Sequence, residues 1–253
     1  MTSERVRATV FLDADNTLWD TDQVFASAQL GLLDDVEARS GRTVQDADRL
    51  AFVRAIDQAL AERHHDGLRY PPTLLVRAIA RTLEGEAGAQ AAKQAWLGQR
   101  GSSLSAADED AIVADYFGKL KATPDLRPGV AEGMAQLRDA GCFVLIVTEA
   151  ALKRTEATAV LLGLEGSFNR VIEGRKRPEL YRRVLKLAGA PENAFMIGDQ
   201  LDRDIVPAKA AGLTTIFFPG GFQPRWLPEE QDVRPDHRIA RFDQALPIIM
   251  AQG

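Results

Sequence analysis

A run of three apolar residues leads directly into two closely spaced carboxylates near the start of the chain. Residues 10–12 are Val-Phe-Leu, Asp13 follows them, and Asp15 comes two positions later. A short apolar run of this kind is typical of a strand that is buried on both faces of a parallel sheet. Asn16 favours a turn, so the strand should end just past Asp13. The run therefore predicts an α/β fold with both carboxylates at the carboxyl end of a strand, where open α/β sheets bind their ligands.

Two carboxylates this close together repel each other. Without a partner, one of Asp13 and Asp15 would be driven to keep its proton. A divalent cation removes that problem, and hard cations such as Mg²⁺ prefer oxygen ligands. The pair therefore predicts a metal site in which a carboxylate nucleophile lies next to a carboxylate acid/base. The alternative interpretation is an Asp- and Asn-rich turn that only closes a strand.

After residue 20 the hydrophobic pattern becomes helical and stays so for about a hundred residues. Ser105 favours an N-cap with Asp108 at the third helical position, a carboxylate variant of the capping box. His64 and His65 fall at the end of the second helix and are interpreted as exposed residues. The pattern predicts helices near residues 23–41, 46–63, 71–85, 87–97 and 105–120.

The chain then alternates between helices and strands, which is the pattern of βαβ units and a parallel sheet. Predicted strands cover residues 142–148, 170–172, 194–197 and 214–218, with an added edge strand at 237–239. Predicted helices cover residues 130–140, 152–162, 178–187, 204–211 and 242–250, the last weakened by Pro247. We therefore predict a Rossmann-like three-layer core of residues 1–20 and 123–253, with residues 21–122 inserted after the first strand as a helical cap.

Composition and charge exclude several classes of protein. The net charge of −5 gives no basic patch for nucleic acid. The single cysteine, Cys142, rules out an internal disulfide framework and a cysteine-based zinc site, and its apolar surroundings predict a buried structural thiol. No apolar run is long enough to span a bilayer or to form a signal-peptide core, so we expect a cytoplasmic protein without membrane contacts. No oligomeric state follows from the sequence.

Polar residues also follow two of the later predicted strands. Thr148 ends one of them, and Asp199 and Asp204 come directly after another, while Lys176 precedes a helix. Because parallel strands bring their carboxyl ends to one edge of a sheet, these residues should converge with the aspartates of the first strand. A hydroxyl, a lysine and a metal-binding carboxylate cluster together describe a phosphate site.

The order of these motifs resembles the haloacid dehalogenase-like hydrolase superfamily. Residues 11–18, Phe-Leu-Asp-Ala-Asp-Asn-Thr-Leu, look like its first motif, and residues 145–148, Leu-Ile-Val-Thr, look like its second. Lys176, two positions before Pro178, looks like the third motif, and residues 198–204, Gly-Asp-Gln-Leu-Asp-Arg-Asp, look like the fourth. The resemblance extends from about residue 9 to residue 218, and the helical insertion lies where this family carries its C1 cap.

The resemblance implies a role for each aspartate. Asp13 would be the nucleophile that forms an aspartyl-phosphate, a known use of carboxylates in phosphoryl transfer. Asp15 would protonate the leaving group and then activate water, and its backbone carbonyl would bind Mg²⁺. Asp199 would bind Mg²⁺ directly, and Asp204 would support the metal, a water or a lysine beside it.

The resemblance also implies how the phosphoryl group is held. Thr148 and backbone amides after Asp13 would bind its oxygens, and Lys176 would offset the negative charge of nucleophile and phosphate. Lys176 is preferred over Arg175 and Arg177 because its spacing to Pro178 is similar to the family pattern. Thr17 is interpreted as a structural residue whose hydroxyl holds the loop.

Asp15 also separates the possible reactions. Dehalogenases of this family lack an aspartate at that position, because halide needs no proton on leaving. We therefore predict a Mg²⁺-dependent phosphatase acting on a small phosphorylated metabolite. A phosphomutase or another phosphotransferase keeps both aspartates and remains an alternative, and a 2-haloacid dehalogenase is a weaker one. A phosphate-binding module without activity would be expected to lack these acidic residues.

Overall fold

The computed structural model describes residues 8–62, 70–99 and 103–251, so the predicted positions of His64 and His65 lie outside the described part. The contacts of the chain divide it into two compact units. The first comprises Met1–Asp22, Thr123–Gln223 and Leu227–Gly253, and the second comprises Gln23–Ala122 and Pro224–Trp226. The three-residue segment of the second unit is held on a helix of that unit, because the backbone N–H of Arg225 donates to Oε1 of Gln58 at 2.9 Å.

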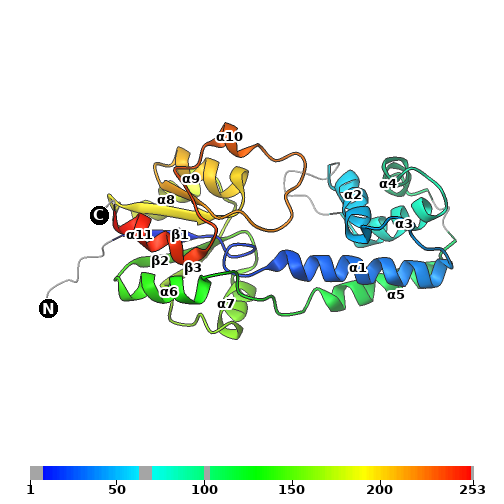
Figure 1. Ribbon diagram of the computed structural model, residues 1–253, viewed down its shortest axis with the longest axis horizontal. Coiled ribbons are helices and arrows are strands. Elements are labelled where there is room, and N and C mark those ends of the chain that lie inside the picture. The colour runs from blue at the N-terminus through cyan, green and yellow to red at the C-terminus, as the bar shows by residue number, and fades with distance from the viewer. Residues whose placement is uncertain (1–7, 63–69, 100–102, 252–253) are drawn as a thin grey trace. The chain divides into compact units, whose positions relative to one another are not determined.

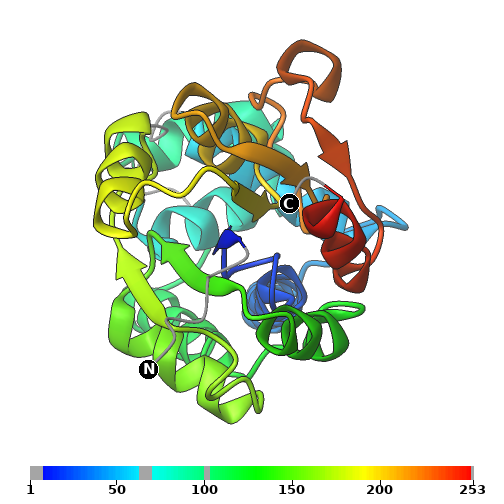
Figure 2. The same cartoon turned by 90° about the vertical axis from the view of Figure 1, so that its left-hand side faces the viewer.

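The first unit is built on a parallel sheet of six strands, as the alternating pattern predicts. The strands lie in the order β3-β2-β1-β4-β5-β6, which places the first strand of the chain between β2 and β4. Figure 2 shows the sheet from its end, with β3 in yellow-green at one edge and β6 in orange at the other. The strands are β1 (Thr9–Leu12), β2 (Phe143–Thr148), β3 (Arg170–Glu173), β4 (Ala194–Gly198), β5 (Thr214–Phe217) and β6 (His237–Arg238).

Helices cover both faces of this sheet, which gives the predicted three layers (Figure 1). Val10 and Leu12 of β1 pack into the apolar core on the side of α6 (Val130–Asp139), α7 (Leu152–Leu161) and α11 (Ala245–Met250). Phe11 points to the opposite side, where it meets α8 (Pro178–Leu187) and α9 (Val206–Ala210). All three side chains are fully buried, as expected for a short strand with no polar face.

A π-helical segment replaces the start of a predicted helix. The sequence pattern predicts a helix from Asp204, but the chain becomes helical earlier, in the π-helix η1 (Leu201–Ile205) that runs into α9. Pro207 has no backbone N–H to donate to the carbonyl of Arg203 four residues earlier, so that carbonyl lacks its α-helical donor. The hydroxyl of Tyr181 donates to that carbonyl instead, at 3.5 Å.

The chain after β5 differs from the prediction in two places. A short helix, α10 (Glu230–Val233), lies in a segment for which no helix is predicted. The last predicted helix is divided into a 3₁₀ turn, η2 (Phe242–Gln244), and α11. The division places Pro247 in the first turn of α11, where a missing N–H costs no hydrogen bond.

The second unit contains the five predicted helices, packed around their own apolar core. The predicted capping box is present, with Oγ of Ser105 accepting from the backbone N–H of Asp108 at 3.2 Å. The second helix begins at Arg49 and not at residue 46, because Asp48 acts as its N-cap and accepts from the N–H of Ala51 at 2.9 Å. The helices are α1 (Thr21–Ser40), α2 (Arg49–Ala61), α3 (Pro72–Leu83), α4 (Gly88–Trp96) and α5 (Ala106–Lys119).

No helix in the described ranges combines the length and the apolar character that a membrane crossing requires. The longest of them, α1, has twenty residues and carries charged side chains in its first turn and in its C-terminal half. Cys142 is buried, as predicted from its apolar neighbours.

A partly buried carboxyl group lies inside the helical unit. Asp57 of α2 accepts a hydrogen bond from the hydroxyl of Tyr70 and another from Nε2 of Gln29 at 3.0 Å. Burial raises the pKa of Asp57 above its ordinary value, although the two hydrogen bonds and the charge of Arg54 oppose the shift. The folded protein therefore holds this proton more tightly than the unfolded chain does.

We expect Asp57→Asn to change the pH dependence of stability. Because the folded pKa of Asp57 is raised, this group's contribution makes unfolding easier as pH rises from the ordinary carboxyl range through the folded pKa. An asparagine side chain has nearly the same shape as that of aspartate and no charge, so this loss should disappear in the variant. Urea unfolding across that pH window measures it. The exposed Asp115 of α5 supplies the control variant Asp115→Asn, and an equal pH slope in all three proteins would contradict the expectation.

Candidate active site

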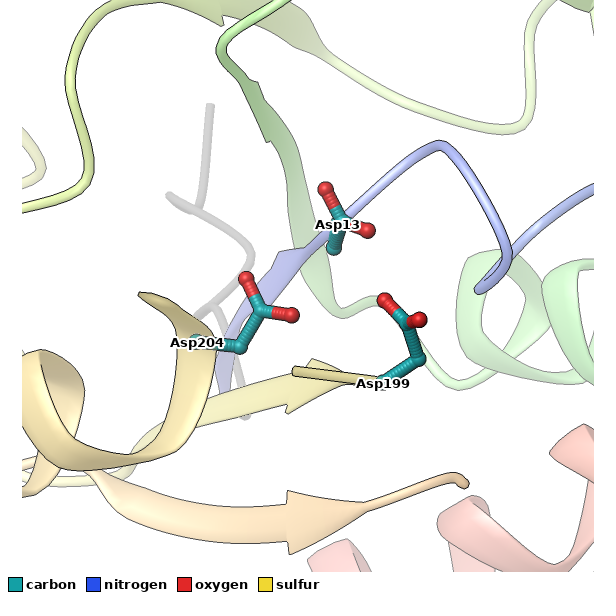
Figure 3. A group of neighbouring side chains, drawn as sticks. All are labelled: Asp13, Asp199 and Asp204. Atoms are coloured by element: carbon teal, nitrogen blue, oxygen red, sulfur yellow. The ribbon is translucent and has the colours of Figure 1, made fainter. Parts of the chain in front are cut away.

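Three carboxylates meet at the carboxyl edge of the sheet. Asp13 comes directly after β1, Asp199 directly after the neighbouring strand β4, and Asp204 lies in the π-helix η1. All three are buried, and each offers an oxygen within 4.8 Å of the others. Figure 3 shows the three side chains pointing toward one another from these separate elements. The register of the parallel pair, Leu12 opposite Ile197, explains why the residues that follow the two strands come together.

The last residue of β4 has no side chain, and Asp204 occupies the space. A Cβ atom on Gly198 would lie 2.4 Å from both Cβ and Cγ of Asp204, which is closer than any real contact. Oδ2 of Asp204 is held in that space by the backbone N–H of Gln200 at 2.9 Å. A glycine at position 198 is therefore needed for the close approach of η1 to the strand end.

Lys176 supplies a positive charge inside the carboxylate cluster. It precedes α8, and its Nζ donates to Oδ1 of Asp13 and, at 2.6 Å, to Oδ1 of Asp204. Its side chain is only 6% exposed. The tertiary structure brings the central residue of the basic run at positions 175–177 into the cluster.

Burial and mutual repulsion shift the proton affinity of these groups. Burial raises the pKa of Asp13 to about 7, with the charges of Asp204 and Asp15 adding to the rise and Lys176 opposing it. Burial and the neighbouring carboxylates also raise the pKa of Asp199 well above its ordinary value. Burial alone would lower the pKa of Lys176, but Asp13 and Asp204 raise it far more. One ammonium faces three carboxyl groups, so full ionisation of the cluster would leave an excess of negative charge.

The excess charge and the chemistry of the donors fit a hard divalent cation. The three side chains offer only carboxylate oxygens, which are the ligands that Mg²⁺ prefers. Thr17, which is fully buried, adds a hydroxyl to this group. Its Oγ1 lies 3.2 Å from Oδ2 of Asp13 and 3.5 Å from Oδ1 of Asp199, so it links the two strand ends directly. The sequence predicts only a loop-holding role for Thr17, and the link to Asp199 is visible only in the structure.

Two donors, one from the loop after β1 and one from the first residue of α1, orient Asp15. Nε1 of Trp19 donates to Oδ1 of Asp15 at 3.1 Å, and the hydroxyl of Thr21 donates to the same oxygen at 2.6 Å. Both bonds go to Oδ1, so Oδ2 is the oxygen that would carry a proton. The loop folds back on itself because Asn16 adopts a left-handed conformation, with φ of 60°, and its N–H donates to the carbonyl of Trp19 at 2.8 Å. The hydrogen bonds to Asp15 and Asn16 cannot be predicted from the spacing of residues in the sequence.

Thr148 lies at the same edge of the sheet as Asp13. It is the last residue of β2, which pairs with β1 in a register that places Leu12 opposite Ile146. The residue is 1% exposed, and its Oγ1 accepts from the backbone N–H of Ala150 at 3.0 Å. Because the hydroxyl oxygen accepts in this bond, its own proton is directed to another acceptor.

Arg127 braces the loop that carries Asp15, and the sequence analysis misses it. Its Nη1 donates to the carbonyls of Asn16 at 2.5 Å and Phe218 at 3.2 Å, and its Nη2 donates to the carbonyl of Pro219 at 2.8 Å. The guanidinium also lies 3.8 Å from the centre of the Phe218 ring. These contacts join the loop after β1 to the loop after β5, at the edge where the carboxylates gather.

Comparison with protein families matches the part of the chain that carries these site residues. A family model described as haloacid dehalogenase-like hydrolase matches residues 8–212. Glyceraldehyde 3-phosphate phosphatase from Methanopyrus kandleri is 28% identical over 149 residues, which is 55% of this chain and 62% of that protein. Phosphoglycolate phosphatase from Nitrosococcus oceani is 32% identical over 121 residues, which is 45% of this chain and 53% of that protein. The chain thus spans somewhat more than half the length of these curated relatives.

A solved structure shares the fold over nearly the whole chain. A haloacid dehalogenase-like family hydrolase from Xanthomonas campestris superposes with a TM-score of 0.63 and 21% sequence identity. The match covers 97% of this chain and 96% of that one. At this level of identity the likeness concerns the fold.

Proposed function

Because this chain belongs to the haloacid dehalogenase-like hydrolase family, we propose that it is a phosphatase that hydrolyses the phosphate monoester of a small metabolite. The observation that carries the proposal is the oriented carboxyl of Asp15, held by Trp19 and Thr21 near the buried Asp13. An ester oxygen needs a proton when it leaves phosphorus, and Asp15 is the group that supplies it. The relatives named for glyceraldehyde 3-phosphate and phosphoglycolate agree with a small phosphorylated substrate.

Asp13, Asp199, Asp204 and the backbone carbonyl of Asp15 are the groups that would hold the metal ion. A bound Mg²⁺ would neutralise negative charge and orient the phosphoryl group. Asp13 and Asp199 would be direct ligands. Asp204, which also accepts from Lys176, would support the metal shell or the lysine.

The reaction proceeds in two displacements at phosphorus. In the first, a carboxylate oxygen of Asp13 attacks, the bond from phosphorus to the ester oxygen breaks, and Asp15 gives its proton to that oxygen. In the second, the Asp15 carboxylate takes a proton from water, the water oxygen attacks phosphorus, and the bond to Asp13 breaks. Inorganic phosphate leaves, and both aspartates return to their first states.

Two further groups hold the transferring phosphoryl group in this scheme. Lys176 offsets the charge that accumulates on Asp13 and the phosphoryl oxygens. Thr148 donates its hydroxyl to one of those oxygens. We further propose that residues 21–122 act as a cap over the substrate. A cap of this kind would keep bulk solvent away from the reacting phosphoryl group.

Phosphate release tests the proposal. Purified protein is incubated with an aryl phosphate and with a panel of small phosphate monoesters, with and without Mg²⁺. Metal-dependent release of inorganic phosphate that follows enzyme concentration supports a phosphatase. Isomerised substrate without release of phosphate would instead make the protein a phosphomutase, and halide release from a 2-haloacid would make it a dehalogenase.

We expect Mg²⁺ to raise the melting temperature of the protein. A ligand that binds only the folded state at about a hundred times its dissociation constant adds about 2.7 kcal/mol to the free energy of unfolding. Asp199→Asn removes a proposed ligand and should abolish the increase, whereas Asp202→Asn, at an exposed position three residues further on, should retain it. Thermal unfolding with Mg²⁺ and with a chelator measures both. An undiminished Mg²⁺ effect in Asp199→Asn would contradict the metal assignment.

A further inference from the structure

One carboxylate joins three of the segments that carry the site. Glu149 follows Thr148 at the end of β2, and its Oε1 accepts from the backbone N–H of Lys176 at 2.9 Å. Its Oε2 accepts from Nη1 of Arg203 at 2.7 Å. Arg203 belongs to η1 and immediately precedes Asp204. Each bond of Glu149 therefore reaches a residue that is part of the site or next to it in the chain.

Glu149 bonds the backbone N–H of Lys176, so this bond helps to fix the point from which the Lys176 side chain extends. Nζ of Lys176 must reach Asp13 and Asp204 together, and the lysine lies in the segment between β3 and α8. A main-chain bond at the same residue limits how far that segment can shift. The bond to Arg203 restrains η1 in the same way, on the side from which Asp204 enters the cluster.

We propose that Glu149 is a positioning residue that holds the Lys176 ammonium in place between Asp13 and Asp204. The inference rests on the proposed function for its effect on turnover, but not for its effect on the position of the lysine. From the sequence, Glu149 is a departure from the family pattern after Thr148 that could tune the substrate pocket. The structure gives it a role, because its two acceptor oxygens bond both the segment before α8 and the helix η1.

The contribution of Glu149 to overall stability is small by comparison. Its side chain is 31% exposed and that of Arg203 is 46% exposed, and ion pairs exposed to this extent contribute little to the free energy of unfolding. A loss of Glu149 should therefore appear in the geometry of the site and leave the fold intact.

A second glutamate, which also links the chain after β2 to the chain at the end of β3, provides a matched control. Glu173, at the end of β3, accepts from the backbone N–H of Leu152 at 2.7 Å through its Oε2. It thus crosses between the loops in the opposite direction from Glu149 and makes the same kind of bond. Glu173 has no hydrogen bond to Lys176 or Arg203 among the described contacts. Glu173→Ala removes a comparable link without touching the lysine.

Chemical labelling of Lys176 tests the proposal without any assay of activity. The metal-free protein is treated with an amine-acylating reagent, and the rate at which Lys176 is modified is followed by peptide mass spectrometry. The Lys176 side chain is 6% exposed and bonded to two carboxylates, so it should react slowly in the wild type. In Glu149→Ala the rate should rise about threefold or more, because the loop opens more readily. Glu173→Ala should react at the wild-type rate.

Kinetics add a readout that a purely structural role would not change. Glu149→Ala should lower kcat about 10- to 100-fold, as is typical when a group that orients a catalytic residue is lost, with little change in KM. Glu149→Gln keeps one oxygen to accept from the Lys176 N–H and should recover part of both the protection and kcat. In a Lys176→Met background, Glu149→Ala should have little further effect on kcat, because its target is gone.

The labelling results decide the positioning role of Glu149, and phosphate release decides the proposed phosphatase function. Faster labelling in Glu149→Ala but not in Glu173→Ala, with partial recovery in Glu149→Gln, supports the positioning role. Labelling of Lys176 at the wild-type rate in Glu149→Ala overturns it, and so does equal acceleration in both alanine variants. A wild-type protein that releases no phosphate from any ester refutes the proposed function, and the labelling result still decides the role of Glu149.

Discussion

Asp13→Asn is expected to abolish phosphate release, with kcat lower by at least about 10⁴-fold, since an amide cannot form the acyl-phosphate. The change is nearly isosteric, and Oδ1 of the amide still accepts from Lys176 and thereby preserves the site geometry. The residual rate should show no burst of product, because no phosphorylated enzyme accumulates.

The same substitution should not destabilise the metal-free protein. Asp13 is buried beside Asp199 and Asp204, and only one ammonium offsets the three carboxylates. Removing one of them relieves repulsion that burial strengthens. We therefore expect a melting temperature for metal-free Asp13→Asn at or above that of the wild type, which separates a chemical defect from a folding defect.

Single-turnover and steady-state phosphate release, with thermal unfolding of the same samples, measure both expectations. Asp202→Asn is the control, since it removes an exposed carboxylate of η1 and should keep wild-type turnover. Phosphate release by folded Asp13→Asn within tenfold of the wild type would rule out Asp13 as the nucleophile.

Asp15→Asn should impair the reaction in a way that depends on the leaving group. A well-placed general acid contributes about 10²- to 10⁴-fold to rate, so kcat/KM for an alkyl phosphate should fall by about that factor. An activated aryl phosphate, whose leaving group needs little help from a proton, should lose much less in its first displacement. The geometry supports this expectation because Trp19 and Thr21 hold Oδ1 and direct the proton to Oδ2.

The ratio of kcat/KM for the two substrates is the measurement. Asp20→Asn removes a carboxylate from the same loop and should leave that ratio unchanged. An equal loss on alkyl and aryl substrates in Asp15→Asn would mean that Asp15 serves only the metal or the fold. A loss confined to the alkyl substrate would assign the proton transfer to Asp15.

Much of the fold follows from short-range pattern. The apolar run at residues 10–12 predicts a strand without a polar face, and Val10 and Phe11 do pack on opposite sides of the sheet. Ser105 and Asp108 predict a capping box, which is present. These predictions are confirmed because alternation, caps and turns are decided by residues a few positions apart.

The departures arise where distant residues or single prolines decide the local structure. The π-helix η1 begins before the predicted helix, and the carbonyl of Arg203, which Pro207 leaves without its α-helical donor, accepts from the distant Tyr181. Pro247 divides the last helix into two parts. Hydrophobic periodicity gives no warning of the first, where a distant side chain bonds one backbone carbonyl, whereas Pro247 already weakens the prediction of the last helix.

The sequence by itself determined the parallel α/β core and identified candidate aspartates at its strand ends, because apolar runs and the residues that follow them are local features. Only the tertiary structure decided which partners those aspartates have. Thr17 reaches Asp199 across 182 positions of the chain, and Glu149 reaches Arg203 across 54. Such contacts depend on the order of strands in the sheet and the paths of the loops, and no spacing along the chain encodes them.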